Sequence, residues 1–165
     1  MKRFAVIGIV LALTLGGSVI GSSASADMDS ALALFSEDKF EAALEEFLVH
    51  AEEGDPVAQT MAGYMYDFGL GVDTDYETAS FWYAQAAVQG DSLAQYFLAG
   101  LYFEGLGVDQ SYEDAAYWYR QSANQGDPDA QYYLALMYQT GDGVPQDDIE
   151  AADWMLLAAE SGNAE

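Results

Sequence analysis

The stretch GDPVAQTMAGYMYDFGLGVDTDYETASFWYAQAAVQ, residues 54–89, decides the fold, because the two stretches that follow it repeat its pattern. Residues 90–125 and 126–161 align with it without a gap, at a period of 36 residues. The recurring columns include Ala58/Ala94/Ala130, Gln59/Gln95/Gln131, Gly69/Gly105/Gly141, Gly71/Gly107/Gly143 and Trp82/Trp118/Trp154. A fixed period in this range predicts a solenoid, in which each unit buries its apolar face only against its neighbours.

Each block carries the start and stop signals of two helices. Asp55 and Asp127 stand directly before a proline, which suits an N-cap followed by the first helical position. The first helix is expected to end at a Gly-x-Gly-Val turn such as Gly69–Val72, because the first glycine can take the left-handed conformation. Second starts follow at Asp75, Ser111 and Asp147. The fold class predicted is all-α, a right-handed α-solenoid of stacked antiparallel helix hairpins.

We expect three full repeats, at 54–89, 90–125 and 126–161, followed by a short remnant ending at residue 165. Residues 27–53 fit the same phase and predict an N-terminal capping hairpin, in which Asp29–Phe35 forms only a brief first helix. Residues 162–165 begin a further block. The outer face of the last hairpin is therefore a candidate surface for docking or self-association.

The first 26 residues have the pattern of a signal peptide. Lys2 and Arg3 precede an uncharged apolar run, and Ala24-Ser25-Ala26 is a small-x-small cleavage signature. We predict a cut after Ala26, a periplasmic or secreted location, and no stable membrane insertion after cleavage. The alternative is an uncleaved anchor, since residues 4–20 approach the minimum length of a span.

The chain is strongly acidic, with 28 acidic residues against four basic ones and a formal net charge of −24. This charge excludes nucleic acid as a partner, because a phosphate backbone needs a basic surface. The acidity has two readings: a surface adapted to solubility or salt, or one that steers a basic partner or divalent cations toward the protein. The absence of cysteine excludes disulfides and thiol chemistry.

The sequence offers little to catalysis. It contains one histidine, no thiol and no Gly-x-Ser-x-Gly elbow. The Gly-x-Gly-Val turns lack the third glycine and the flanking strand of a dinucleotide site. Asp73-x-Asp75 is only a fragment of a calcium loop. We therefore predict a protein that is not an enzyme, without cofactor and without a metal site.

The pattern Ala-Gln-Tyr-x-Leu-Ala-x-Leu-Tyr, then Gly-x-Gly-Val, then Ala-x-x-Trp-Tyr resembles the Sel-one-like repeat family, a relative of the tetratricopeptide repeats. The resemblance covers residues 54–161 fully and 29–53 in part. It implies a non-catalytic scaffold or adaptor of the bacterial cell envelope. A cysteine-rich exported branch of the family is linked to β-lactam binding and hydrolysis, so a β-lactam or cell-wall hydrolase is one alternative. A carbohydrate-binding module in polysaccharide secretion is another.

Candidate partner-binding residues are large first-helix side chains that differ between the blocks and are predicted to face away from the Ala/Leu/Tyr core. First helices conventionally line the concave side of such solenoids, where apolar groups suit a bound helix or extended segment. The tryptophans, in contrast, are predicted to pack in the core. The alternative for the first-helix positions is burial against the adjacent repeat. The candidates are Met61, Tyr64, Phe68, Phe97, Phe103 and Tyr133.

Overall fold

A computed structural model describes residues 24–161, and within these residues the chain is all-helical. Eight helices of 13 residues each follow one another. They are α2 (Ala24–Ser36), α3 (Phe40–Glu52), α4 (Pro56–Phe68), α5 (Tyr76–Val88), α6 (Ser92–Glu104), α7 (Tyr112–Asn124), α8 (Pro128–Thr140) and α9 (Asp148–Glu160). The predicted fold class is confirmed as a helical solenoid.

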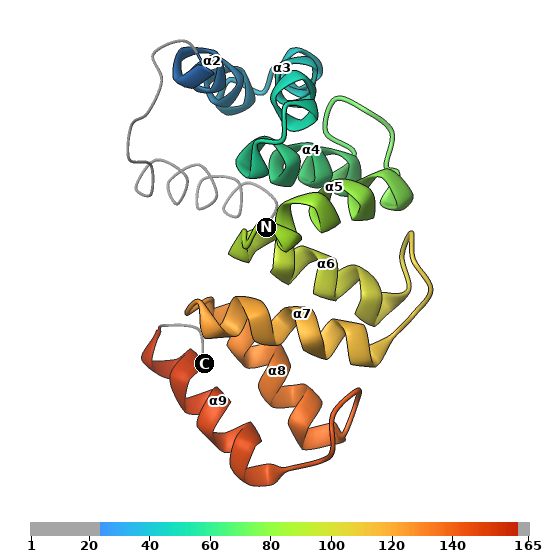
Figure 1. The fold of residues 1–165 in the computed structure, drawn as a ribbon, viewed down its shortest axis with the longest axis vertical. Coiled ribbons are helices and arrows are strands. Elements are labelled where there is room, and N and C mark those ends of the chain that lie inside the picture. The colour runs from blue at the N-terminus through green and yellow to red at the C-terminus, as the bar shows by residue number, and fades with distance from the viewer. Residues whose placement is uncertain (1–23, 162–165) are drawn as a thin grey trace.

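Consecutive helices pack against one another along the whole column from α2 to α9, and α4 also touches α6 (Figure 1). Each helix therefore has neighbours that are close in sequence, as the repeat pattern requires. None of the helices in residues 24–161 is long and apolar enough to cross a membrane.

The predicted caps are present at both ends of the helices. Asp55 accepts a hydrogen bond from the backbone N–H of Ala58 at 2.9 Å, and Asp91 and Asp127 make the equivalent bond. Asp75, Ser111 and Asp147 cap the second helices in the same way. Gly69, Gly105 and Gly141 end the first helices in the left-handed conformation. Local sequence thus sets the start of both helices and the end of the first helix in each of the three full repeats.

The second glycine of each Gly-x-Gly-Val turn joins one unit to the unit before it. A Cβ atom at Gly107 would lie 2.2 Å from the backbone carbonyl of Tyr76, at the start of α5. Gly143 meets Tyr112 at 2.0 Å and Gly71 meets Phe40 at 2.5 Å by the same construction. These turns therefore rest directly on the N-terminus of the preceding second helix, an approach that only glycine permits.

The N-terminal hairpin differs from its prediction in one respect. Asp29–Phe35 was expected to form only a brief helix, but α2 is as long as the others. The helix begins at Ala24, and it therefore overlaps the end of the predicted signal peptide. The rest of that signal, residues 1–23, lies outside the described residues.

The second helix of the last hairpin is less buried than the second helices of the two units before it. Helices α5 and α7 each bury five residues, including Tyr83 and Tyr119, whereas α9 buries only Ala151 and Ala158. The large side chains Ile149, Leu156 and Leu157 are exposed. No described helix follows α9 to cover them. The tryptophans pack against the hydrophobic core, as predicted.

Candidate functional site: an aromatic groove between the repeats

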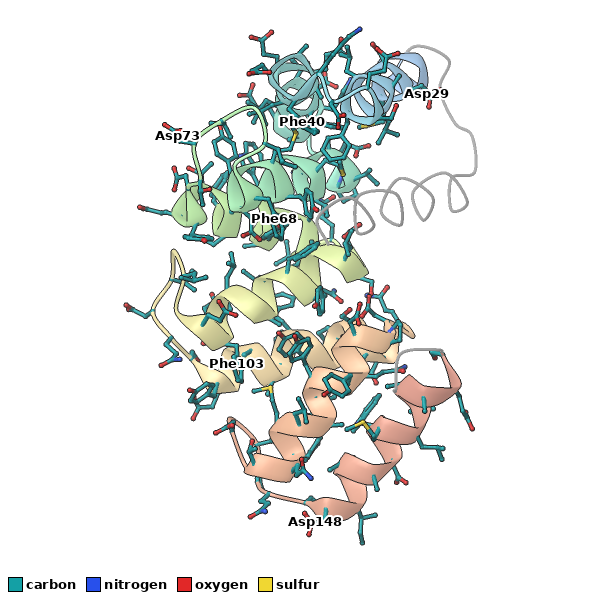
Figure 2. All side chains as sticks on the ribbon, turned by 180° about the vertical axis from the view of Figure 1, so that it is seen from behind. Asp29, Phe40, Phe68, Asp73, Phe103 and Asp148 are labelled. Carbon is teal, nitrogen blue, oxygen red and sulfur yellow. The ribbon has the colours of Figure 1, made fainter. Side chains whose placement is uncertain are left out.

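A cleft of about 380 Å³ runs along the first helices of the units and is lined mainly by aromatic rings. We call it the aromatic groove. Figure 2 shows Phe68 and Phe103 at successive levels of the stack. The groove is lined by Asp67, Phe68, Tyr76, Tyr96, Phe97, Gly100, Leu101, Phe103, Glu104, Leu106, Tyr119 and Tyr133.

Stacked ring pairs support the groove where one unit meets the next. Tyr83 on α5 stacks on Phe97 on α6, with the ring centroids 5.2 Å apart and the planes 15° apart. One repeat later, Tyr119 on α7 stacks on Tyr133 on α8 at 5.3 Å and 10°. The tyrosine of a second helix thus supports an aromatic ring of the following first helix. Such pairs hold the neighbouring rings in fixed positions.

Four of the six candidate partner-binding residues lie together in this groove. Phe68 and Tyr133 are each 38% exposed, and Phe97 and Phe103 are partly buried. Phe68 stands nearly edge-on to Phe97, at a centroid distance of 6.2 Å and an angle of 73°. The rings therefore present both faces and edges along the groove.

The other two candidates do not face solvent, so the prediction that they point away from the core is wrong. Met61 is fully buried, and Tyr64 is 5% exposed. The N-terminal hairpin covers this part of α4: the ring of Tyr64 contacts Phe35 on α2 and Phe68 at centroid distances of 6.4 Å and 4.5 Å. Burial against the adjacent unit, the alternative reading, holds for these two positions.

Two carboxylates lie in the groove that the sequence analysis did not single out. Asp67 is partly buried, and its Oδ2 atom accepts a hydrogen bond from the hydroxyl of Tyr83 at 3.2 Å. Burial raises the pKa of Asp67 to about 6; the bond from Tyr83 opposes the rise and the charge of Glu104 adds to it. The sequence carries one signal for these two acids. The order of the acidic and the aromatic residue is reversed at equivalent positions, Asp67-Phe68 in one block and Phe103-Glu104 in the next. Spacing alone did not indicate that the two acids share a cleft.

Tyr83, Tyr96 and Tyr119 are neutral at physiological pH. Burial is the main cause that raises the pKa of Tyr96, Tyr119 and Tyr83. Their hydroxyls therefore act as hydrogen-bond donors or acceptors without adding charge. The charge of the groove at neutral pH is set by Asp67 and Glu104.

No cationic side chain within residues 24–161 lines the groove. The two Lys or Arg residues of this range are engaged elsewhere. Lys39 pairs with Glu37 at 2.7 Å, and Arg120 donates to the hydroxyl of Tyr138 while lying 5.5 Å from its ring centroid. The carboxylates of the groove are thus left without a counter-charge from this part of the chain.

The described residues contain no cluster of three or more His, Asp or Glu side chains placed to hold a metal ion. A smaller cleft near the N-terminus is lined by Ser30, Glu46, Val49 and His50. There the Nδ1 atom of His50 lies 3.4 Å from the Oε2 atom of Glu53. The cleft brings a serine hydroxyl and an imidazole together, but the hydroxyl of Ser30 donates to Oε1 of Glu46 at 3.3 Å and not to His50.

The model of the Sel1 repeat matches residues 56–91, 92–127 and 128–163, and the chain belongs to the Sel1 repeat family. The matched period is the one read from the sequence, displaced by two residues. No curated protein matches the chain. Sel1 repeat proteins are generally protein-interaction scaffolds, and the repeat fold is typically non-enzymatic.

Three of the solved structures that are similar to this one show the extent of the likeness. A Sel1 repeat protein from Oxalobacter formigenes has a TM-score of 0.78 and 33% identity, over 83% of this chain and 55% of its own. A protective antigen of uropathogenic Escherichia coli, c5321, has a TM-score of 0.80 and 33% identity, over 96% of this chain and 34% of its own. The chain thus spans about half or less of these relatives. Cysteine-rich protein B of Helicobacter pylori shares the fold, with a TM-score of 0.60 and 16% identity over 74% of this chain and 90% of its own.

Proposed function

We propose that this protein is a non-catalytic scaffold of the bacterial cell envelope that holds a protein partner in the aromatic groove. The observation that carries the proposal is the groove itself: a continuous row of partly exposed rings, supported by the stacked pairs Tyr83–Phe97 and Tyr119–Tyr133. Partly exposed aromatic side chains on a rigid support are the anchors that dominate protein interfaces. The location in the envelope rests on the signal-peptide pattern of residues 1–26.

Phe68 and Tyr133 are the residues with which to test this function. Both line the groove and are 38% exposed, so removing their rings takes away binding surface with limited damage to the core. The matched controls are Phe81 and Tyr117, which are each 54% exposed and lie outside the groove. Each pair removes one phenylalanine ring and one tyrosine ring, and the control pair is the more exposed of the two.

The experiment is crosslinking and affinity capture from envelope extract. The baits are the wild-type chain, the Phe68→Ala/Tyr133→Ala variant and the Phe81→Ala/Tyr117→Ala variant. We expect a specific protein to be captured by the wild type and the control and to be lost from the groove variant. Circular dichroism checks that helix content is the same in all three. Equal capture by all three baits would show that the partner does not bind in the groove.

A further inference from the structure

The aromatic groove carries an unbalanced negative charge that no described residue neutralises. Asp67 lies at the end of α4 and Glu104 at the end of α6, and both line the same cleft. The charge of Glu104 opposes the ionisation of Asp67 in this partly desolvated site. A cation placed between them would relieve this repulsion.

The surrounding rings suit the same kind of ligand. The face of an aromatic ring is the negative end of its quadrupole, and it attracts a cation within about 6 Å of the centroid. Phe68, Phe97 and Tyr133 bring such rings to the groove together with the carboxylates. Aromatic faces beside carboxylates form a site for a cationic group that has a flat or apolar part to stack.

We propose that the groove binds a basic segment of a protein partner, with an arginine or lysine side chain seated among Phe68, Phe97 and Tyr133 and paired with Asp67 and Glu104. This inference rests on the proposed scaffold function and adds the chemistry of the partner. Arginine fits best, because its planar guanidinium stacks on rings and donates to carboxylates at once. The net charge of −24 would also speed the approach of a basic segment.

A polypeptide is favoured over a sugar by the charge of the site. A neutral oligosaccharide would stack on the rings but would leave the two carboxylates without a counter-ion. An acidic polysaccharide would be repelled by them. Among the ligands that aromatic grooves hold, a basic peptide satisfies both the rings and the carboxylates.

The test starts from a random-peptide library displayed on phage and selected on the full chain. We expect the selected peptides to be enriched in arginine or lysine. Resynthesised with citrulline in place of the critical arginine, a selected peptide keeps its shape and loses its charge, and we expect its affinity to fall about tenfold or more. Affinity is measured by isothermal titration.

Variants of the protein locate the site. Glu104→Gln removes one carboxylate charge from an exposed position and should weaken the arginine peptide about three- to tenfold, with no effect on the citrulline peptide. Tyr133→Leu keeps the apolar area and removes the ring face; it should weaken the arginine peptide by a similar factor. The controls are Glu45→Gln, an exposed acid on α3, and Tyr117→Leu, and neither should change the affinity.

The outcomes separate this inference from the function on which it rests. Selected peptides without basic residues, bound in the groove, would overturn the cationic partner and leave the scaffold standing. If basic peptides bound the Glu104→Gln and Tyr133→Leu variants as tightly as the wild type, their binding site would lie outside the groove. This result would also overturn the inference. No selected peptide at all, together with binding of an N-acetylglucosamine tetrasaccharide, would overturn both.

Discussion

The Nε2 atom of Gln89 donates a hydrogen bond to the Oε1 atom of Gln59 at 2.8 Å, and it also reaches the backbone carbonyl of Gly54 at 3.1 Å. Gln59 in turn donates to the carbonyl of Ala51 at 3.1 Å. Gln89 thus ties the end of its unit to the start of the same unit, and Gln59 ties that start to the unit before it. Gln125 and Gln95 repeat the same bond at 2.8 Å in the next unit.

The third unit lacks this bond, which leads to a first prediction. The position of Gln89 is taken by Ser161, and the buried Oε1 atom of Gln131 has no hydrogen-bond partner among the described residues. Restoring the donor with Ser161→Gln should raise the free energy of unfolding by about 0.5–1.5 kcal/mol and slow amide exchange in α9. The measurements are chemical denaturation and hydrogen–deuterium exchange resolved by peptide.

The reciprocal change serves as the control for this prediction. Gln89→Ser removes the donor from a unit that has it and should lower stability by a similar or larger amount, because Gln59 Oε1 is then left buried and unpaired. If Ser161→Gln left the exchange of α9 unchanged while Gln89→Ser destabilised the chain, the missing donor would not limit the stability of the last hairpin.

The second glycine of the turns gives a second prediction. Gly107→Ala should destabilise the protein by more than about 3 kcal/mol, because it combines a positive φ with a Cβ atom inside contact distance of the Tyr76 backbone. Gly90→Ala has a positive φ but open space around the new Cβ, and should cost only about 1–2 kcal/mol. Thermal denaturation of both variants isolates the contact between units, and equal losses would refute it.

Asp67 gives a prediction about pH. Its folded-state pKa of about 6 lies above its ordinary value of 3.8, so the folded state binds more protons between these values than the unfolded state does. The stability contributed by Asp67 is therefore present below about pH 4 and is lost as the pH rises through about 6. Asp67→Asn removes this loss and should be more stable than the wild type by about 1–2 kcal/mol at pH 8, after allowance for solvent screening.

The measurement is urea denaturation of wild type and Asp67→Asn from pH 4 to pH 8. The difference in stability should grow across this interval, since only the wild type ionises at residue 67. Glu45→Gln removes an equal charge from an exposed site and accounts for the change in net charge. A difference between wild type and Asp67→Asn that stayed constant with pH would contradict the shifted pKa.

Burial predicts that Met61 and Phe68 respond differently to truncation. Met61→Ala should lower the free energy of unfolding by about 2–5 kcal/mol, because the side chain is fully buried. Phe68→Ala, at a position 38% exposed, should cost less, yet it should weaken a groove-bound peptide while Met61→Ala leaves the affinity of the folded fraction unchanged. Denaturation measures the effect of each variant on stability, and titration measures its effect on peptide affinity. A loss of affinity in Met61→Ala but not in Phe68→Ala would show that Met61 belongs to the binding surface.

The sequence predicted the groove only in part, and the errors have one physical cause. Phe68, Phe97, Phe103 and Tyr133 were chosen because they are large and vary between blocks, and they do line the groove. Met61 and Tyr64 passed the same criterion and are buried: Met61 belongs to the core cluster, and the ring of Tyr64 is covered by Phe35 of the N-terminal hairpin. Helical spacing gives the direction of a side chain from its own helix, but not which neighbour stands there.

The sequence by itself determined the period, the caps and the turns. Asp55, Gly69 and Asp75 act through bonds to residues a few positions away, so their roles are readable from the chain. Only the tertiary structure decided what each unit presents to the next. The contact of Gly107 with Tyr76, and the shared cleft of Asp67 and Glu104, depend on how one hairpin is rotated on another. That rotation follows from the packing of all the side chains at the interface, so it cannot be predicted from any single stretch of sequence.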